Sequence, residues 1–186
     1  LVVALIIWLT GGNPLSFLSQ QAVDDINIQQ SNYVPSAEDE QTAEFAKTIL
    51  AATEDVWTKI FSEHGATYVS PEMVLFSGST TSGCGQASSS TGPFYCPADQ
   101  KLYIDLSFFN QMQNQLGAGG DFAYAYVIAH EVGHHVQYLL GTMNKVTRQQ
   151  QQSNERESNQ LNVRLELQAD FYAGVWAYHD NQDYHS

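Results

Sequence analysis

Two histidines and a glutamate in residues 125–137 have the types and the spacing of a metal-dependent hydrolytic site. His130 and His134 are four positions apart, so on a helix both imidazoles project from the same face, about one turn apart. Neutral imidazoles in this arrangement can fill two corners of a zinc tetrahedron, and Glu131 lies beside them, where it can take a proton from a metal-bound water. The pattern predicts a metallopeptidase with Glu131 as its general base.

A catalytic zinc needs a third protein ligand and one open position for water. The candidate ligand is Glu166, which shares a helix face with Asp170, and the small residues Ala173 and Gly174 continue that face. Burying a carboxylate without a partner is costly, whereas a zinc ion or an imidazole N–H would offset that cost. We therefore predict that Glu166 binds the metal and that Asp170 accepts a hydrogen bond from a ligand histidine. The alternative is that both acids lie on a solvated face.

The residues around the two histidines indicate how the motif is packed. His135 lies about 100° around the helix from His134, so we expect it to have a structural role or to donate a hydrogen bond from outside the ligand set. The small residues Ala129 and Gly133 leave room for another element to approach the helix closely.

The helices and strands that must position these side chains can be predicted from the spacing of apolar residues and from the Gly and Pro residues that interrupt it. The histidines belong to a predicted helix, and the two acids belong to a second one. The predicted elements are a helix over 36–65 with Ser36 as its N-cap, strands over 67–69 and 73–76, a loop over 78–97, a strand over 101–109, a helix over 122–140, a polar Gln-rich segment over 148–152 and a helix over 161–178.

The length and the net charge of the chain indicate how many domains it has and which partners it can bind. A chain of 186 residues suits one globular domain with a sizeable core. Seven basic against twenty acidic residues give a formal net charge of −13. Because phosphate contacts need clustered Lys and Arg, and the sequence has no basic stripe, nucleic acid is excluded as a partner.

The first residues form an apolar run that stops at Gly11 and Gly12. Such a run is shorter than the roughly 20 residues that span a bilayer. We read residues 1–12 as part of a membrane anchor, with a signal-peptide core as the second choice and a buried strand as the third. Residues 13–35 are expected to be a linker or extended arm. The domain is therefore expected to be membrane-anchored and extracytoplasmic, in the periplasm or outside the cell.

Cys84 and Cys96 flank a stretch rich in Ser, Gly and Thr. Their separation suits a disulfide in an exported domain, whereas zinc binding by this pair is disfavoured because the spacing differs from a CxxC pair. Two free buried thiols are the alternative.

Three blocks of the sequence together resemble the putative neutral zinc metallopeptidases of bacteria. They are residues 94–109 (FYCPADQKLYIDLSFF), 130–137 (HEVGHHVQ) and 166–177 (ELQADFYAGVWA). The resemblance implies an α+β, zincin-like metallopeptidase domain over residues 36–186, mostly helical with a small β-sheet. It also implies a single N-terminal membrane span. The family's chains extend past the second helix, so residues 36–186 are expected to be a truncated or shortened form of the domain.

The same resemblance implies the roles of the site residues. His130 and His134 would be zinc ligands and Glu131 the general base. The Glu-x-x-x-Asp pair is similar to the third-ligand signature of thermolysin-type zincins, which adds Glu166 as ligand and Asp170 as its companion.

The expected function is that of a zinc metalloendopeptidase with Zn²⁺ as cofactor and a peptide or protein as substrate. By analogy with zincins, an extended substrate would lie along residues 101–107 as an edge strand. The alternative is a non-catalytic, membrane-tethered domain in which zinc is structural, but structural sites usually have four protein ligands and favour Cys. A His/His/carboxylate set can also hold Fe(II), although the Glu between the histidines argues against it.

Overall fold

The computed structural model describes residues 36–109 and 121–183. The expected anchor (1–12) and linker (13–35) lie outside the described residues. The helices that lie wholly within these residues are α3 (Ala37–Glu63), η1 (Ser89–Thr91), α5 (Asp121–Leu139), α6 (Thr142–Gln150) and α7 (Glu155–Asp183). The strands are β1 (Glu72–Phe76), β2 (Ser79–Ser82), β3 (Gly85–Ser88), β4 (Phe94–Cys96) and β5 (Lys101–Asp105).

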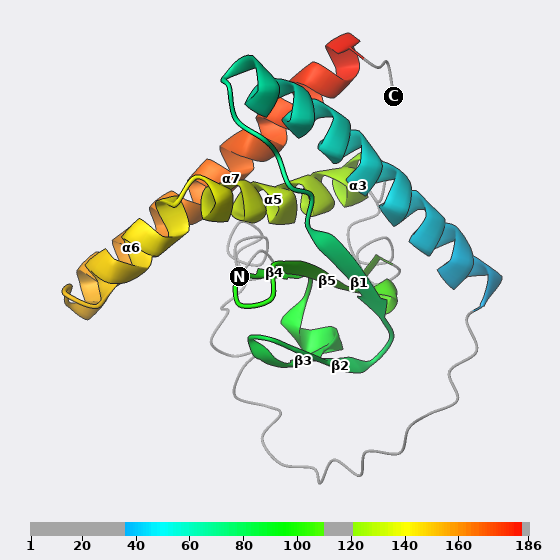
Figure 1. The fold of residues 1–186 in the computed structure, drawn as a ribbon. Helices are drawn as coiled ribbons and strands as arrows, with labels where there is room; N and C mark the ends of the chain where they lie inside the picture. Colours follow the sequence, from blue (N-terminus) through cyan, green and yellow to red (C-terminus); the bar gives the residue numbers. More distant parts are fainter. Residues whose placement is uncertain (1–35, 110–120, 184–186) are drawn as a thin grey trace, which may run out of the picture.

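Helix α5 is the centre of the fold (Figure 1). It packs against α3, α6 and α7 and against strand β4. Every residue from 127 to 137 is buried, which agrees with its apolar sequence, because a helix that is hydrophobic all round must be covered all round. The helix ends where Gly141 adopts a positive φ of 73°, a conformation that glycine adopts without strain.

The predicted first helix is confirmed. At its start the Ser36 hydroxyl accepts from the Asp39 N–H (3.1 Å), and the Asp39 carboxylate accepts from the Ser36 N–H (2.8 Å). This capping box satisfies two backbone donors that the first turn would otherwise leave unpaired. Buried residues along the helix, including Val56, Trp57 and Phe61, turn toward the core.

A three-stranded sheet in the order β1-β5-β4 lies beside α5. Strand β5 pairs in parallel with β1 and antiparallel with β4. The prediction that residues 101–107 form an edge strand is therefore wrong, because β5 has a neighbour on both sides. The strand also ends at Asp105, not at Phe109. There the Asp105 carboxylate accepts from the Ser107 N–H (2.8 Å), and residues 106–109 turn into a helix.

Two other loop and strand predictions are wrong. Residues 67–69 are not a strand, since Val69 is exposed and its carbonyl is bonded to His135 instead of to a neighbouring strand. Residues 78–97, predicted to be a loop, contain the antiparallel hairpin β2–β3, the short helix η1 and strand β4. Their Ser/Gly/Thr composition favours turns locally, while strand pairing depends on partners distant in sequence.

The second half of the chain is more helical than its polar sequence predicts. The Gln-rich segment up to Gln150 belongs to α6, and α7 begins at Glu155, six residues before the predicted start. Asn154 and Glu157 form a reciprocal cap there, since the Asn154 amide oxygen accepts from the Glu157 N–H (3.0 Å) and the Glu157 carboxylate accepts from the Asn154 N–H (3.3 Å). The cap satisfies backbone donors at the start of a turn that has few apolar contacts.

The largest core cluster lies between α3, α5 and the sheet. Its fully buried members include Leu102 and Ile104 of β5 and Ile128, Val132 and Val136 of α5. The expected fold class is confirmed, since the described residues form an α+β domain that is mostly helical with a small sheet. Among these residues, none of the helices combines the length and the hydropathy that crossing a bilayer requires.

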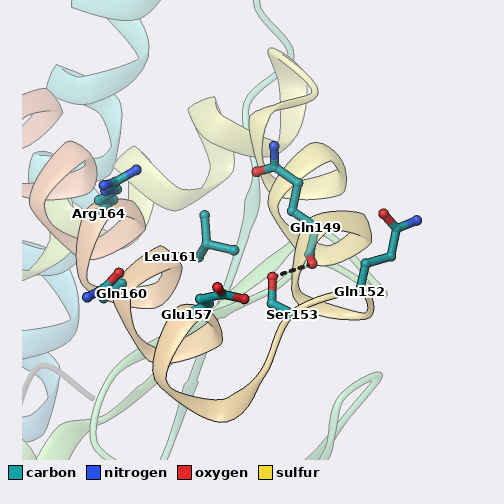
Figure 2. A pocket seen from close by; sticks show the side chains of 7 residues that line it. All are labelled: Gln149, Gln152, Ser153, Glu157, Gln160, Leu161 and Arg164. Atoms are coloured by element: carbon teal, nitrogen blue, oxygen red, sulfur yellow. Dashed lines mark hydrogen bonds between the residues drawn. The ribbon is translucent and has the colours of Figure 1, made fainter.

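A surface hollow of about 440 Å³ lies between α6 and α7 (Figure 2). Most of its lining side chains are polar, and they include none of the predicted site residues. They are Gln149, Gln152, Ser153, Glu157, Gln160, Leu161 and Arg164. The hollow is therefore separate from the histidine motif.

Candidate metal centre

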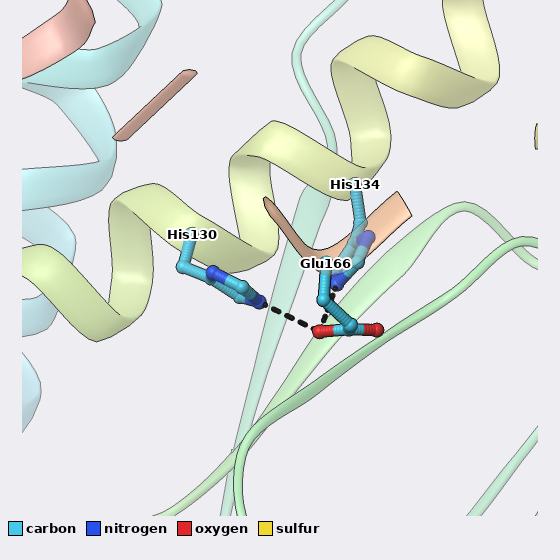
Figure 3. A group of neighbouring side chains, drawn as sticks. All are labelled: His130, His134 and Glu166. Carbon is cyan, nitrogen blue, oxygen red and sulfur yellow. Dashed lines mark ion pairs between the residues drawn. The ribbon is translucent and has the colours of Figure 1, made fainter. Parts of the chain in front are cut away.

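Helices α5 and α7 bring His130, His134 and Glu166 together (Figure 3). Oε2 of Glu166 lies 3.3 Å from Nε2 of His130 and 3.5 Å from Nε2 of His134. The three potential ligand atoms lie within 4.8 Å of one another. Both imidazoles turn the same nitrogen toward the carboxylate, which is the convergence that a bound cation requires.

The chemistry of this donor set fits a zinc ion. Nε2 of His130 is buried and faces Oε2 of Glu166 at 3.3 Å. A zinc ion between this nitrogen and the carboxylate would satisfy both buried groups. Two imidazole nitrogens and one carboxylate oxygen are three ligands of the kind zinc prefers, with one position left open.

Asp170 lies behind His130. Its Oδ1 is 2.8 Å from Nδ1 of His130 and also accepts a hydrogen bond from the Tyr126 hydroxyl (3.0 Å). Because an ionised carboxylate can only accept, Nδ1 of His130 carries the proton and Nε2 keeps its lone pair for a metal. Sequence reasoning missed Tyr126, although its position four residues before His130 places it on the same helix face.

Glu131 is buried, with 2% of its surface exposed, and its Oε2 accepts from the main-chain N–H of Tyr95 (2.9 Å). Burial raises the pKa of Glu131 above its ordinary value, although the neighbouring His134 and His130 oppose the shift. A carboxylate with a raised pKa is a better proton acceptor near neutral pH. The carboxylate is thus both fixed in place and chemically suited to take a proton.

In the absence of a metal, His130, His134 and Glu166 shift one another's pKa values. Burial alone would raise the pKa of Glu166, but hydrogen bonding and charge from His130 and His134 lower it to about 2. Burial alone would lower the pKa of His134, but Glu166 and Glu131 raise it to about 9. The pKa of His130 is raised in the same way, against its burial. Without a metal, the raised pKa values of the two histidines favour protonated rings beside the Glu166 carboxylate.

The family model described as "putative neutral zinc metallopeptidase" matches residues 1–186. The chain belongs to this family. It is 46% identical to the uncharacterized protein YpfJ of Escherichia coli strain K12 over 178 residues, which cover 96% of this chain and 62% of that relative. It is 51% identical to the uncharacterized protein Rv2575 of Mycobacterium tuberculosis strain H37Rv over 113 residues, which cover 60% of this chain and 37% of that relative.

This family member thus spans less than two thirds of the length of the curated relatives that it matches. No solved structure matches the chain significantly. The cluster of His130, His134 and Glu166 offers a donor set suited to the zinc ion that the family description implies.

His135 of this metallopeptidase-family chain is not part of the cluster. Its Nε2 lies 2.7 Å from the carbonyl of Val69, and its Nδ1 lies 3.0 Å from the Tyr95 hydroxyl. A carbonyl can only accept, so Nε2 carries the proton and Nδ1 accepts from Tyr95. Burial also lowers the pKa of His135, which keeps the ring neutral. The structure places it as a link between α5, β4 and the segment before β1.

Gly133 allows α5 and α7 to approach each other closely, as its small size predicts. A Cβ atom at this position would lie 2.9 Å from the carbonyl oxygen of Ala169 on α7. Ala173 is fully buried, whereas a Cβ at Gly174 would meet nothing within 4 Å. Gly174 therefore does not continue the face of α7 that packs on α5, contrary to the sequence prediction.

The predicted disulfide is confirmed, since Cys84 and Cys96 are bonded. Cys84 lies in the turn between β2 and β3, and Cys96 ends β4. The bond therefore ties the hairpin to the strand whose Tyr95 holds Glu131.

Proposed function

We propose that the protein is a zinc-dependent metalloendopeptidase that hydrolyses peptide bonds in peptide or protein substrates. The observation that carries the proposal is that the side chains of His130, His134 and Glu166 converge. The buried Glu131 directly follows His130 on α5. A structural zinc site would normally be closed by a fourth protein ligand. Among the described residues, three such ligands converge here: His130, His134 and Glu166.

A zinc ion held by His130, His134 and Glu166 would supply Lewis acidity, polarising the scissile carbonyl and lowering the pKa of a water molecule toward neutrality. Glu131 receives the proton that this water loses and passes it to the leaving amine, acting first as base and then as acid. Burial raises the pKa of Glu131, which favours both steps near neutral pH. The Tyr95 N–H holds Oε2 of Glu131, so the carboxylate enters the reaction in one orientation.

Strand β4 is our proposed place for the substrate backbone, in place of the central strand β5. β4 is at one edge of the sheet, and its side away from β5 lies next to Glu131, to which its Tyr95 N–H donates. An extended peptide that lay alongside β4 would bring its main chain next to the base. Nearby, Phe94 stacks on Tyr103 of β5 with ring centroids 5.1 Å apart, which stiffens the strand.

We also propose that the domain works outside the cytoplasm, attached to a membrane through residues 1–12. The disulfide between Cys84 and Cys96 supports an oxidising compartment, where such bonds persist. The apolar N-terminal sequence supports the attachment.

The deciding experiment is digestion of a library of unstructured peptides by the zinc-loaded protein, with Glu131→Gln alongside. We expect the wild type to cleave and the variant to lose at least ~100-fold in rate, the smallest typical contribution of a general base. Zinc content should stay the same in both. Glu155→Gln is the matched control, because it makes the same chemical change on an exposed turn of α7.

Two results would contradict the proposal. Full activity in Glu131→Gln would exclude Glu131 as the base. Stoichiometric zinc without cleavage by either protein would support the structural-zinc alternative.

A further inference from the structure

The side chain of Gln137 is completely buried between α5 and α7. Its Nε2 donates to the main-chain carbonyl of Leu165 (2.7 Å) and to Oε1 of Gln168 (3.1 Å). Its Oε1 lies 2.9 Å from Nδ1 of His134. The amide therefore joins a histidine of the metal cluster to the helix that carries Glu166.

The orientation of the amide follows from its partners. A main-chain carbonyl can only accept, so the NH₂ group of Gln137 must face Leu165 and the carbonyl oxygen must face His134. An amide oxygen likewise only accepts, so Nδ1 of His134 must carry a proton. The lone pair of the neutral ring is then on Nε2, the nitrogen that faces Glu166 at 3.5 Å.

We propose that Gln137 is a positioning residue that holds His134 in its Nδ1-protonated form, with Nε2 free for the metal, and fixes the ring relative to Glu166. The inference rests on the metal site of the proposed function. Leu165 immediately precedes Glu166, so one amide sets the spacing between two of the three cluster residues.

The two histidines of the cluster thus have different hydrogen-bond partners at Nδ1. Nδ1 of His130 faces the carboxylate of Asp170, whereas Nδ1 of His134 faces a neutral amide. A carboxylate at position 137 would add a negative charge to a buried region that already contains Glu131 and Glu166, where uncompensated charge is costly. Glutamine provides the same acceptor without the charge and adds the donors that reach α7.

The variant that tests this role is Gln137→Met, which keeps the length of the side chain and removes its hydrogen bonds. We expect the zinc dissociation constant, measured by competition with a chelator, to rise about 10- to 100-fold, as for other partners of ligand histidines. Gln160→Met is the matched control, because it makes the same chemical change at an exposed position of α7, away from the Gln137 amide. Its zinc affinity should stay that of the wild type.

A second measurement uses the unaltered protein and so does not depend on how Gln137→Met folds. In the zinc-loaded wild type, long-range proton–nitrogen correlation of ¹⁵N-labelled His134 should show a protonated Nδ1 and a metal-bound Nε2. An unprotonated Nδ1, or zinc bound through Nδ1, would overturn the proposal.

The zinc measurements separate this inference from the peptidase proposal. If Gln137→Met binds zinc as tightly as the wild type, the positioning role is wrong and the proposed function stands. If the wild type binds no zinc, both are wrong.

Discussion

The main-chain N–H of Tyr95 donates a 2.9 Å hydrogen bond to Oε2 of Glu131. The hydroxyl of the same tyrosine reaches Nδ1 of His135, four residues further along α5. Strand β4 is therefore fastened to α5 at two successive turns by one residue. The position of the proposed base relative to the edge of the sheet depends on this double contact.

Tyr95→Phe should remove the hydroxyl contact with His135 and keep the main-chain contact with Glu131. The change removes the hydroxyl and leaves the main-chain N–H in place, so the buried Nδ1 of His135 loses its donor. We expect the free energy of unfolding to fall by about 1–3 kcal/mol, the cost of a buried polar atom left unsatisfied. Urea denaturation measures it, with Tyr178→Phe on the exposed face of α7 as the control. Equal stabilities of the two variants would show that the hydroxyl contact is unimportant.

Gly133→Ala should force α5 and α7 apart. The new Cβ would lie 2.9 Å from the Ala169 carbonyl, which belongs to a helix backbone and cannot rotate away. We expect a loss of about 1–3 kcal/mol in unfolding free energy, typical of overpacking, together with weaker zinc binding.

The matched control for this change is Gly174→Ala on α7, where a Cβ meets nothing within 4 Å. It should stabilise the protein by roughly 0.5–1 kcal/mol, because alanine is the better helix former. If thermal melts show no difference between the two variants, the close approach at Gly133 does not matter for stability.

Reduction of the Cys84–Cys96 bond should destabilise the fold. The bond closes a loop of 12 residues in sequence separation, and breaking such a loop typically costs about 2–4 kcal/mol. Thermal melts with and without a reductant measure the effect. The double variant Cys84→Ser, Cys96→Ser should melt at the lower temperature and be insensitive to the reductant. A wild type that melts alike in both conditions would contradict this expectation.

The metal-free protein should become less stable as the pH rises from neutral. The raised pKa of His134, about 9 against an ordinary 6.5, stabilises the fold fully below pH 6.5 and is lost as the pH rises through 9. The lowered pKa of Glu166, about 2 against 4.5, stabilises it above pH 4.5 and is lost as the pH falls toward 2. Urea unfolding with a chelator should therefore show the contribution of this pair greatest between pH 4.5 and 6.5.

The control for this prediction is His134→Gln, which removes the titrating ring. Its unfolding free energy should fall less between pH 6.5 and 9 than that of the wild type. Parallel curves over this range would mean that the pKa of His134 is not raised in the folded protein.

Local patterns in the sequence predicted the parts of the candidate site that lie on single helices. The spacing of His130 and His134 places both rings on one face, and the spacing of Glu166 and Asp170 does the same on α7. The small size of Gly133 predicted the close approach between the helices. Each of these inferences uses only the helical repeat and the size or charge of a side chain.

Partners that meet only in the folded chain could not be predicted in this way. Tyr95 and Glu131 are 36 positions apart, and a main-chain donor has no side-chain signature. The acceptor role of Gln137 depends on the carbonyl of Leu165, which any residue type would provide. The central place of β5 follows from strand order, which the alternation of apolar residues along one strand does not determine.

The two helices of the candidate centre are joined by residues 140–154, which contain α6. The hydrogen bonds and ion pairs of the cluster described above come from β4, α5 and α7, and none of them involves this connection. The connection instead packs on α5 and α7 away from these groups, with Gln150 of α6 donating to Ser158 and Asn162 of α7. The connection is therefore the place where an insertion, or a break between two separately expressed fragments, leaves every group of the centre present.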